Sequence, residues 1–318
     1  MATKKPRNPI LSALRRAAKD EAAAVSMVER MRGWDTDPAC PRCGDVDVYQ
    51  MKDRKTGERE KNYRWRCRGC GKMYSARTAT VFEETRLPLS VWCHAFWRAC
   101  SSKKGVSALQ IARECEITHK SALFLMHRIR LAMDEGLGGG GKLKGTVEVD
   151  ETYVAGKPRY HRRGMKGRPK GWAKPMVFAM VERGGKVRAQ HVTDVNAKNL
   201  RGEIDKHVEP DARVITDESP YYKGLKKDRH HETVNHRSGE YVRQGTDVTT
   251  NTIEGFFSLL KRGVYGTFHS VSPHHLHRYV SEFEFRYNTR KLSDGERIAE
   301  AFRGAEGKRL LYRQPAEA

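Results

Sequence analysis

Two pairs of cysteines restrict the fold of this chain more than any other feature. Cys40-Pro-Arg-Cys43 and Cys67-Arg-Gly-Cys70 each put two thiolates in one tight turn, and a glycine follows each pair directly. Four thiolates in two turns match the tetrahedral coordination that structural Zn²⁺ prefers. The spacing therefore predicts one structural Zn²⁺ within a zinc ribbon over residues 35–86.

The positive net charge of the chain indicates what kind of molecule it binds. The 318 residues include 61 Lys and Arg against 39 Asp and Glu, a formal net charge of +22. The excess is spread over most of the chain, which favours a polyanionic partner, most simply double-stranded DNA, over a merely basic soluble protein.

The sequence also predicts the compartment. No apolar run approaches the ~18 residues of a membrane span, and the N-terminal MATKKPRNPI lacks the apolar core of a signal peptide. We therefore expect a cytoplasmic protein with no membrane partner. In that compartment its cysteines are metal ligands or core residues rather than disulfides. Three cysteines without metal-ligand spacing are interpreted as core residues: Cys93, Cys100 and Cys115.

Helical patterns flank the cysteine pairs. The N-terminal segment, residues 1–34, is predicted to form one basic helix over residues 8–32, which lies along DNA or packs on the next domain. Residues 87–136 follow a pattern of helix, tight turn and basic helix, with predicted caps at Ser90, Ser107 and Thr118. This is the outline of a helix-turn-helix DNA-binding region, and a three-helix bundle with no DNA role is the alternative.

Two basic residues of the last predicted helix, Arg128 and Arg130, are expected to face outward with His119 and Lys120. Four consecutive glycines then mark residues 137–145 as a flexible linker. After it, strands come first and then alternate with helices, which predicts a mixed α/β domain over residues 146–292. Residues 293–318 are assigned to a charged tail, and the whole chain to a multidomain α+β fold.

The first strand of the mixed domain carries an acid that needs a partner. Asp150 lies among the strand-forming residues of TVEVDETYV, where a buried carboxylate is costly unless it is paired or binds a metal. Asp217 ends another short strand, and Glu254 lies on a helix, opposite its apolar face. Two strand-borne aspartates and a helix-borne glutamate could together hold two divalent ions, as phosphoryl-transfer enzymes require.

Other acids compete for these roles. Glu148 shares a strand face with Asp150, whereas Glu151 and Glu218 adjoin the aspartates and would point the other way. Three solvated acids with unrelated roles are the alternative to a single site.

Basic residues surround the acidic positions in the sequence. The segment from residue 157 to 174 holds eight Lys or Arg and no acid, interrupted by aromatic residues. It suits a nucleic-acid backbone, and a solvated loop is the alternative. The predicted DNA-binding residues are Lys157, Arg162, Arg163, Lys166, Arg168, Lys261 and Arg262. Lys261 lies two helical turns after Glu254, so both belong to one stripe of the helix.

The order of these motifs resembles a known family. A four-cysteine ribbon, a helix-turn-helix-like region, DETYVAGK, VITDESPYY and NTIEGFFSLLKRGVYGTF together resemble bacterial insertion-sequence transposases of the DDE type that carry an N-terminal zinc ribbon. The resemblance covers roughly residues 35–290. It implies an RNase H-like catalytic domain similar to retroviral integrases, and two Mg²⁺ or Mn²⁺ ions per active site.

The resemblance also implies roles for single residues. The acids that bind metal would be Asp150, Asp217 and Glu254, and Lys261 would contact terminal DNA. His236 and Asn251 are weaker site candidates. The implied activity is cleavage at the ends of a DNA element and joining of its 3′-hydroxyl to target DNA. The implied state is a homodimer or higher oligomer on DNA, in a nucleoid-associated bacterial protein.

Two other functions remain open at this point. A zinc ribbon, a helix-turn-helix and a basic surface would suffice for a non-catalytic DNA-binding regulator, an inactive or domesticated relative of transposases. A junction resolvase or an RNase H-type nuclease would share the metal chemistry without requiring the ribbon. Joined DNA products distinguish a transposase from both.

Overall fold

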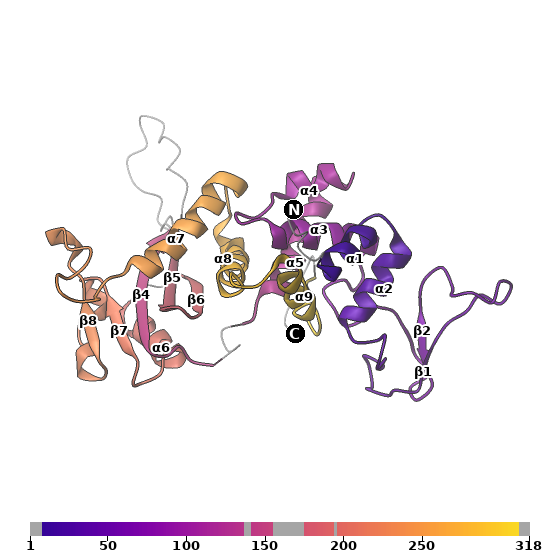
Figure 1. Ribbon diagram of the computed structural model, residues 1–318, viewed down its shortest axis with the longest axis horizontal. Coiled ribbons are helices and arrows are strands. Elements are labelled where there is room, and N and C mark those ends of the chain that lie inside the picture. The colour runs from indigo at the N-terminus through magenta and orange to yellow at the C-terminus, as the bar shows by residue number, and fades with distance from the viewer. Residues whose placement is uncertain (1–7, 137–140, 155–174, 194–195, 312–318) are drawn as a thin grey trace, which may run out of the picture. The chain divides into compact units, whose positions relative to one another are not determined.

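The computed structural model describes residues 8–136, 141–154, 175–193 and 196–311. It divides into two compact units, of which the first joins Met1–Met133 to Leu292–Ala318 and the second is Asp134–Lys291 (Figure 1). The first unit therefore combines segments from both ends of the chain.

The first unit begins with two helices where the sequence predicts one. Helix α1 spans Pro9–Ala17 and helix α2 spans Glu21–Met31. The break occurs because Asp20 adopts an extended backbone and its Oδ2 accepts a hydrogen bond from the amide of Ala23, 2.9 Å away. Such an aspartate starts a new helix, so the single helix predicted over residues 8–32 is corrected to a helical pair.

A small antiparallel sheet carries the cysteine pairs. Its order is β1 (Val48–Gln50), β2 (Trp65–Cys67), β3 (Met73–Tyr74). Trp65 stacks on Tyr74 with ring centroids 6.5 Å apart, and Trp34 meets both rings edge-on. The Trp65 indole N–H donates to Glu29 of α2, 2.7 Å away. These aromatic rings therefore form a small core between the three-stranded sheet and the end of α2.

Three further helices follow: α3 (Leu89–Ser101), α4 (Ala108–Glu114) and α5 (His119–Met133). The hydroxyls of Ser107 and Thr118 accept amide hydrogen bonds at the starts of α4 and α5, as predicted. Ser90 is not a cap. Instead, the carboxylate of Glu21 in α2 accepts hydrogen bonds from the first amides of α3, those of Leu89 and Ser90.

Two arginines expected to face outward are buried. Arg128 and Arg130 are 4% and 1% exposed. The Arg128 guanidinium donates to the carbonyl oxygens of Val81, Glu83 and Leu310, so it joins three chain segments rather than offering its charge to a partner. Within α5, His119 and Lys120 are exposed. The outward basic surface of this helix is therefore limited to its first turn.

The end of the chain is not a simple tail. Residues 294–303 form helix α9 (Asp294–Arg303), which Ser293 and Glu296 start with a reciprocal capping box. Ile298 and Phe302 of α9 are buried, and Phe302 stacks on Phe96 of α3 with ring centroids 4.4 Å apart. Apolar burial thus fixes this segment to the first unit.

The second unit is built on a five-stranded mixed sheet in the order β6-β5-β4-β7-β8. Strand β4 is antiparallel to β5 and parallel to β7, and β7 is parallel to β8. The strands are β4 (Thr146–Tyr153), β5 (Met176–Glu182), β6 (Val187–Val192), β7 (Arg213–Thr216) and β8 (His231–Thr233).

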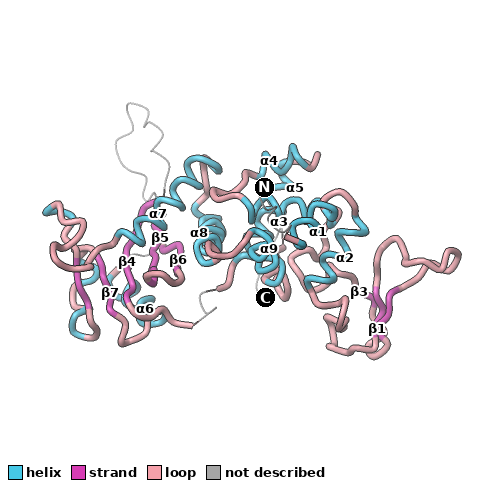
Figure 2. Tube along the Cα trace, in the orientation of Figure 1, coloured by secondary structure: helices cyan, strands magenta, loops and turns pink. Residues whose placement is uncertain are grey.

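Helices cover both faces of this sheet (Figure 2). Helix α6 (Ala197–His207) packs with Val147, Val149 and Phe178 on one face. Helices α7 (Asn251–Gly263) and α8 (Pro273–Asn288) pack with Val177, Ala179 and Val187 on the other. Short helical turns complete the unit: η1 (Pro220–Tyr222), η2 (Leu225–Lys227), η3 (His236–Ser238) and η4 (Val264–Phe268). The chain thus has the multidomain α+β architecture that was expected. In the second unit, three antiparallel strands (β6, β5, β4) are followed by two parallel ones (β7, β8), the strand arrangement expected of an RNase H-like domain.

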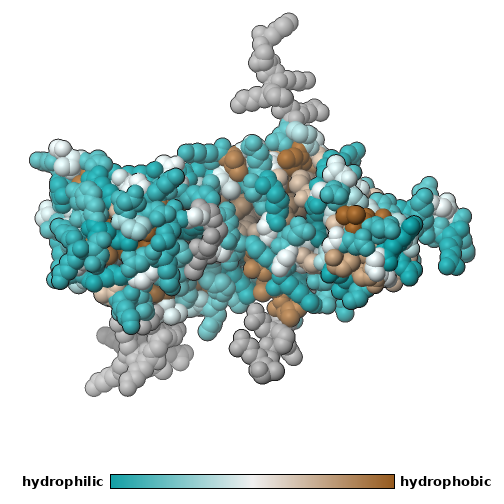
Figure 3. Space-filling view, turned by 90° about the horizontal axis from the view of Figure 1, so that it is seen from below, coloured by the Kyte–Doolittle hydropathy of each residue, from teal (hydrophilic) through white to brown (hydrophobic). Residues whose placement is uncertain are grey.

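The surface is polar. Hydrophilic residues predominate among the described residues on the face shown in Figure 3. In the described part of the chain, no helix is both long and apolar enough to span a bilayer.

Candidate active site and zinc centre

The alternation of β4 decides which acids face which helices. Val147 and Val149 pack toward α6, so Glu148 and Asp150 point to the opposite face, toward α7. Asp150 pairs across the sheet with Ala179, which lies in the core beneath α7 and α8. The local sequence therefore places the Asp150 carboxylate under α7.

The parallel register of β4 and β7 brings Asp217 level with Asp150. Thr146 pairs with Arg213, Val147 with Val214 and Glu148 with Ile215. Two residues further along the same register, Asp217 comes beside Asp150 at the end of β7. The amide of Ser219 donates to Asp217 Oδ1, 3.0 Å away, and so orients this carboxylate.

Glu254 approaches the two aspartates from α7. One side of α7 packs on the five-stranded sheet through four buried apolar residues: Ile253, Phe256, Phe257 and Leu260. Glu254 lies off that stripe and its side chain is 46% exposed. Helix α7 crosses β4 and β5 (Figure 1), so the glutamate lies over the sheet near its central strand.

Electrostatics show that the three acids share one neighbourhood. The pKa of Asp150 is raised from 3.8 to about 7. Burial is the largest cause, the charges of Asp217, Glu151 and Glu254 add to it, and a hydrogen bond from the Glu151 amide opposes it. Burial likewise raises the pKa of Asp217. Two carboxyl groups with raised pKa values lie close to a third acid. In such a site, a bound proton or metal cation is more stable than uncompensated negative charge.

The donor set fits divalent cations. Among the residues that the structure describes, neither Asp150 nor Asp217 forms a salt bridge within 4.0 Å with a basic side chain. The three carboxylates are also not drawn into one tight cluster, since the described residues contain a single group of three or more ligand atoms within 4.8 Å, the cysteines. The observation that favours a cation here is the absence of a described basic partner for Asp150 and Asp217, since buried carboxylates without a counter-charge favour a bound proton or cation.

His236 and Asn251 lie beside Glu254. His236 Nε2 is 3.2 Å from Thr250 Oγ1 and 3.8 Å from Glu254 Oε1, and the Thr250 hydroxyl donates to Glu254 Oε1 at 3.3 Å. Asn251 is the exposed first residue of α7, one turn before Glu254. Sequence reasoning missed Thr250, for which no local motif signals a role.

Basic residues continue the same stripe of α7. Lys261 is half-buried, and Arg262 is exposed with its Nε donating to the Ser258 carbonyl 3.1 Å away. The other residues predicted to bind DNA lie outside the described residues: Lys157, Arg162, Arg163, Lys166 and Arg168.

The competing acids on β4 have structural partners. Glu151 points away from α7, as its position predicts, and accepts a hydrogen bond from the Tyr222 hydroxyl. Glu148 is fully buried, beside Arg183 and the first turn of α7. No local motif signals this contact, because its partners lie 35 and 105 residues away in the sequence.

The cysteine cluster fits zinc. The Sγ atoms of Cys40 and Cys70 lie 3.8 Å apart, and those of Cys43 and Cys67 lie 3.6 Å apart. Four sulfurs at about 2.3 Å from a tetrahedral Zn²⁺ are separated by about 3.8 Å. Cys93 and Cys100 are buried core residues, whereas Cys115 is half-buried.

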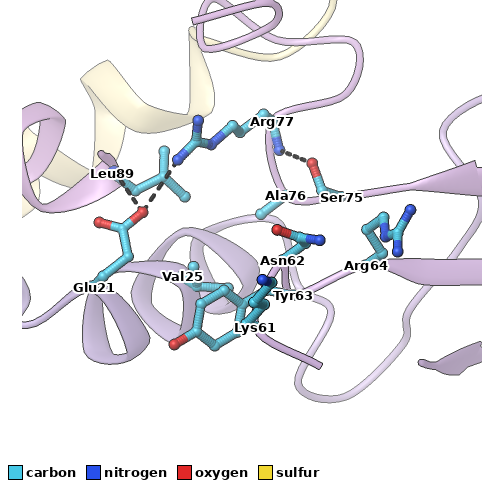
Figure 4. A pocket seen from close by; sticks show the side chains of 10 residues that line it. All are labelled: Glu21, Val25, Lys61, Asn62, Tyr63, Arg64, Ser75, Ala76, Arg77 and Leu89. Atoms are coloured by element: carbon cyan, nitrogen blue, oxygen red, sulfur yellow. Dashed lines mark hydrogen bonds and ion pairs between the residues drawn. The ribbon is translucent and has the colours of Figure 1, made fainter. Parts of the chain in front are cut away.

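A pocket of about 360 Å³ lies in the first unit (Figure 4), whereas Asp150, Asp217 and Glu254 belong to the second. Lys61, Arg64 and Arg77 contribute positive charge to its lining. Its one carboxylate, Glu21, pairs with Arg77 at 3.1 Å and binds the first amides of α3 (Figure 4). That acid therefore has a structural role.

Comparisons with known proteins agree with these observations. Residues 19–73 match the family of transposase zinc-ribbon domains, and residues 142–288 match the family described as ISXO2-like transposase domain. An uncharacterized protein in transposable element ISH50 of Halobacterium salinarum is 27% identical over 281 residues, which cover 84% of this chain and 90% of the relative.

Solved structures show weaker likeness. The Mos1 transposase paired-end complex with left transposon end is 15% identical over 60% of this chain and 74% of that chain, with a TM-score of 0.21. The mariner Mos1 paired end complex with Mg is 13% identical over 97% of this chain and 100% of that chain, with a TM-score of 0.22. At these TM-scores the likeness adds nothing to the assignment.

The two family matches agree with each other and follow the order of the zinc and carboxylate sites along the chain. The chain therefore combines a region similar to transposase zinc-ribbon domains with a region similar to ISXO2-like transposase domains, in that order.

Proposed function

We propose that this transposase binds the ends of its DNA element, cleaves there and joins the released 3′-hydroxyl to target DNA. One observation carries the proposal. Burial, together with the charges of Asp217, Glu151 and Glu254, raises the pKa of Asp150 to about 7. A buried carboxylate with other acids nearby favours a divalent cation as its partner.

The three acids divide the work of holding metal. Asp150 on the central strand, Asp217 at the end of β7 and Glu254 on α7 would together hold the divalent ions. When bound, Mg²⁺ or Mn²⁺ stabilises the charge on the attacking and leaving oxygens of an in-line displacement. His236 and Thr250 orient the Glu254 carboxylate through the contacts at 3.8 and 3.3 Å.

Both chemical steps then use the same residues. In the first, a water oxygen attacks the phosphorus at the end of the element, the bond to O3′ breaks, and a 3′-hydroxyl and a 5′-phosphate result. In the second, that 3′-hydroxyl loses its proton and attacks a target phosphorus, which releases a target 3′-hydroxyl. Neither step requires a covalent protein intermediate, so no serine or tyrosine nucleophile is needed.

DNA binding belongs to the basic surfaces. Lys261 and Arg262 extend from the acids along α7 and contact the terminal DNA, together with Lys157, Arg162, Arg163, Lys166 and Arg168. The zinc ribbon and helices α3 to α5 bind the end sequence. Because two ends are held together, the working form is a homodimer or higher oligomer on nucleoid DNA in the cytoplasm.

A cleavage and joining assay tests the proposal. A labelled duplex bearing the repeat that flanks the gene is incubated with the full chain and Mg²⁺ or Mn²⁺. Wild-type protein should nick at the 3′ end and produce joined molecules, and Asp150→Ala or EDTA should abolish both while leaving DNA binding. Glu151→Gln is the matched control, since it removes the neighbouring acid on the opposite face of β4.

Other outcomes would contradict the proposal. Full cleavage by Asp150→Ala would remove Asp150 from the site. Tight binding without cleavage under any divalent metal would indicate a DNA-binding regulator. Cleavage without joined products would indicate a nuclease of the resolvase or RNase H type.

A further inference from the structure

Glu148 is a second carboxylate on β4, two residues before Asp150 and on the same face of the sheet. Its side chain is 0% exposed. A buried carboxylate is stable only where its oxygens accept hydrogen bonds or meet a cation. The identity of those partners therefore indicates what Glu148 does.

Glu148 has three described hydrogen-bond partners, two in the first turn of α7 and one directly after β5. Its Oε2 accepts a hydrogen bond from the Ile253 amide at 2.9 Å, in the first turn of α7. Its Oε1 accepts from the Thr252 hydroxyl at 2.8 Å and from Arg183 Nε at 2.7 Å. Two of the three contacts thus reach from the central strand to the start of the helix that carries Glu254.

The local side chains at the start of α7 leave the Ile253 amide without a cap, because the Thr249 hydroxyl accepts only from the first amide, that of Asn251, 3.2 Å away. The N-cap residue of α7, Thr250, makes no capping hydrogen bond to the helix amides, and its hydroxyl instead faces His236 and Glu254. The amide of Ile253, third in the helix, is one that an N-cap side chain would normally satisfy. Glu148 takes that place from another strand, and its negative charge is favourable at a helix N-terminus.

Arg183 completes the connection. It directly follows β5, and its Nη2 donates to the carbonyl oxygen of Thr249, 2.9 Å away, in the loop that enters α7. Its Nη1 also contacts Asp247 at 3.1 Å. Glu148 and Arg183 therefore fix both the first turn of α7 and the loop before it.

We propose that Glu148 is a positioning residue that caps α7 from β4 and thereby sets the place of Glu254 relative to Asp150. Successive residues on one face of a strand are about 6.6 Å apart. Strand β4 therefore sets the distance between Glu148, which caps α7, and Asp150. Glu254 directly follows the capped residue Ile253. The inference rests on the proposed function, because it concerns the position of one of the proposed metal ligands.

Single-turnover cleavage at increasing Mn²⁺ concentration tests this role in the full chain. In Glu148→Gln, an NH2 group replaces one acceptor oxygen and the negative charge is lost. Either the Ile253 amide or the Thr252 hydroxyl and Arg183 then lose their acceptor, so the first turn of α7 loosens. The Mn²⁺ concentration for half-maximal cleavage should rise on the order of tenfold, with activity partly restored at saturating Mn²⁺.

A matched control is available in α8. Glu282 is also 0% exposed and pairs with Arg286, 2.6 Å away. Glu282→Gln removes a comparable buried charge from α8 rather than from β4, so it should lower the melting temperature and leave the Mn²⁺ requirement unchanged. If Glu148→Gln behaved like Glu282→Gln, Glu148 would be merely structural and the proposal would be overturned.

A second outcome would overturn it in another way. If folded Glu148→Gln were inactive at every Mn²⁺ concentration, as Asp150→Asn is expected to be, Glu148 would be a metal ligand. Should Glu148→Gln fail to fold, Thr252→Val and Thr252→Ser decide. The valine variant loses one contact to Glu148 and should need more Mn²⁺, whereas the serine variant keeps its hydroxyl and should not.

Hydrogen exchange separates this inference from the proposed function. In Glu148→Gln or Thr252→Val, amide exchange should accelerate over residues 251–256 and stay unchanged in α8, whether or not the protein cleaves DNA. Unchanged exchange at the start of α7 would overturn the cap. If wild-type protein cleaved no DNA, the proposed function would fail while this comparison still decided the role of Glu148.

Discussion

The buried carboxyl group of Asp150 makes the stability of the fold depend on pH, and the proposed metal site would change that dependence. Its pKa, raised from 3.8 to about 7, means that the folded chain holds this proton more tightly than the unfolded chain does. Its contribution to stability is therefore fully present below the unfolded pKa, and is lost as pH rises through about 7. A bound cation replaces the proton and should reverse that trend.

This leads to a prediction for Asp150→Asn, which keeps the shape and removes the charge. Without metal, the variant should melt above wild-type protein by a margin that grows between pH 5 and pH 8, by about 1–4 kcal/mol in unfolding free energy. Added Mn²⁺ should stabilise wild-type protein increasingly at higher pH and leave the variant unaffected. Thermal melts across pH measure both effects, and a margin independent of pH would contradict the predicted shift.

Lys261 provides a prediction about DNA. Its position two turns beyond Glu254 suits contact with a phosphate, so Lys261→Gln should weaken binding of the end duplex and reduce the slope of log affinity against log salt by about one. Lys206→Gln is the control, because Lys206 is exposed on α6, on the opposite face of the sheet. Anisotropy titrations at several salt concentrations make the comparison, and equal slopes for all three proteins would place Lys261 off the DNA.

At the scale of elements, the contact between α7 and α8 holds the site in place. Gly263 ends α7 against the Phe283 ring of α8, and a Cβ there would lie 2.0 Å from Phe283 Cζ. The absence of a side chain lets the helices approach closely. Glu254 and Lys261 are thus held over the sheet partly by a glycine that touches no substrate.

Gly263→Ala should therefore destabilise the protein by about 1–3 kcal/mol, and Phe283→Leu in the same chain should recover part of the loss. Gly255→Ala is the matched control in the same helix, since a Cβ there meets nothing within 4 Å. It should stabilise by about 0.5–1 kcal/mol, because glycine is entropically unfavourable inside a helix. Chemical denaturation measures these differences, and equal effects of both substitutions would argue against the close contact.

Several elements show why sequence patterns have limited reach. The cap at Ser107 and the buried face of α7 follow from local spacing, so both were predictable. The start of α3 was not, because its cap is Glu21, 68 residues earlier. Arg128 is likewise charged in the sequence and buried in the fold, where three carbonyl oxygens accept from its guanidinium.

At the scale of the whole molecule, the cysteine cluster and the three carboxylates belong to different compact units. The cysteine cluster belongs to the first unit, and Asp150, Asp217 and Glu254 belong to the second, which has its own apolar cores. A small sheet of three short strands buries little apolar surface and relies on its metal. Loss of zinc should therefore affect one unit selectively.

A strong chelator should release one zinc per chain, unfold the ribbon and alter the fluorescence of Trp34 and Trp65, whose rings are 5.8 Å apart. The melting of the second unit should stay unchanged. Cys67→Ser should reproduce these effects, whereas Cys115→Ser, outside the cluster, should retain one zinc. Zinc content and two-phase thermal melts test this, and full zinc retention by Cys67→Ser would contradict the proposed ligand set.

The sequence by itself determined the features that depend on neighbours along the chain. These include the zinc ribbon, from the spacing of Cys40 and Cys43 and of their partners, and the mixed α/β character of the second unit. The motif order also indicated the transposase family. Such features are readable because turn spacing and side-chain periodicity act within a few residues.

Only the tertiary structure decided which distant groups meet. Parallel pairing of β4 with β7 sets Asp217 level with Asp150, and Glu148 meets Ile253 although 105 residues separate them. Burial of Ile298 and Phe302 attaches the last helix to the first unit rather than leaving a tail. Strand register and apolar burial are properties of the folded chain as a whole, so no local pattern of residues can encode them alone.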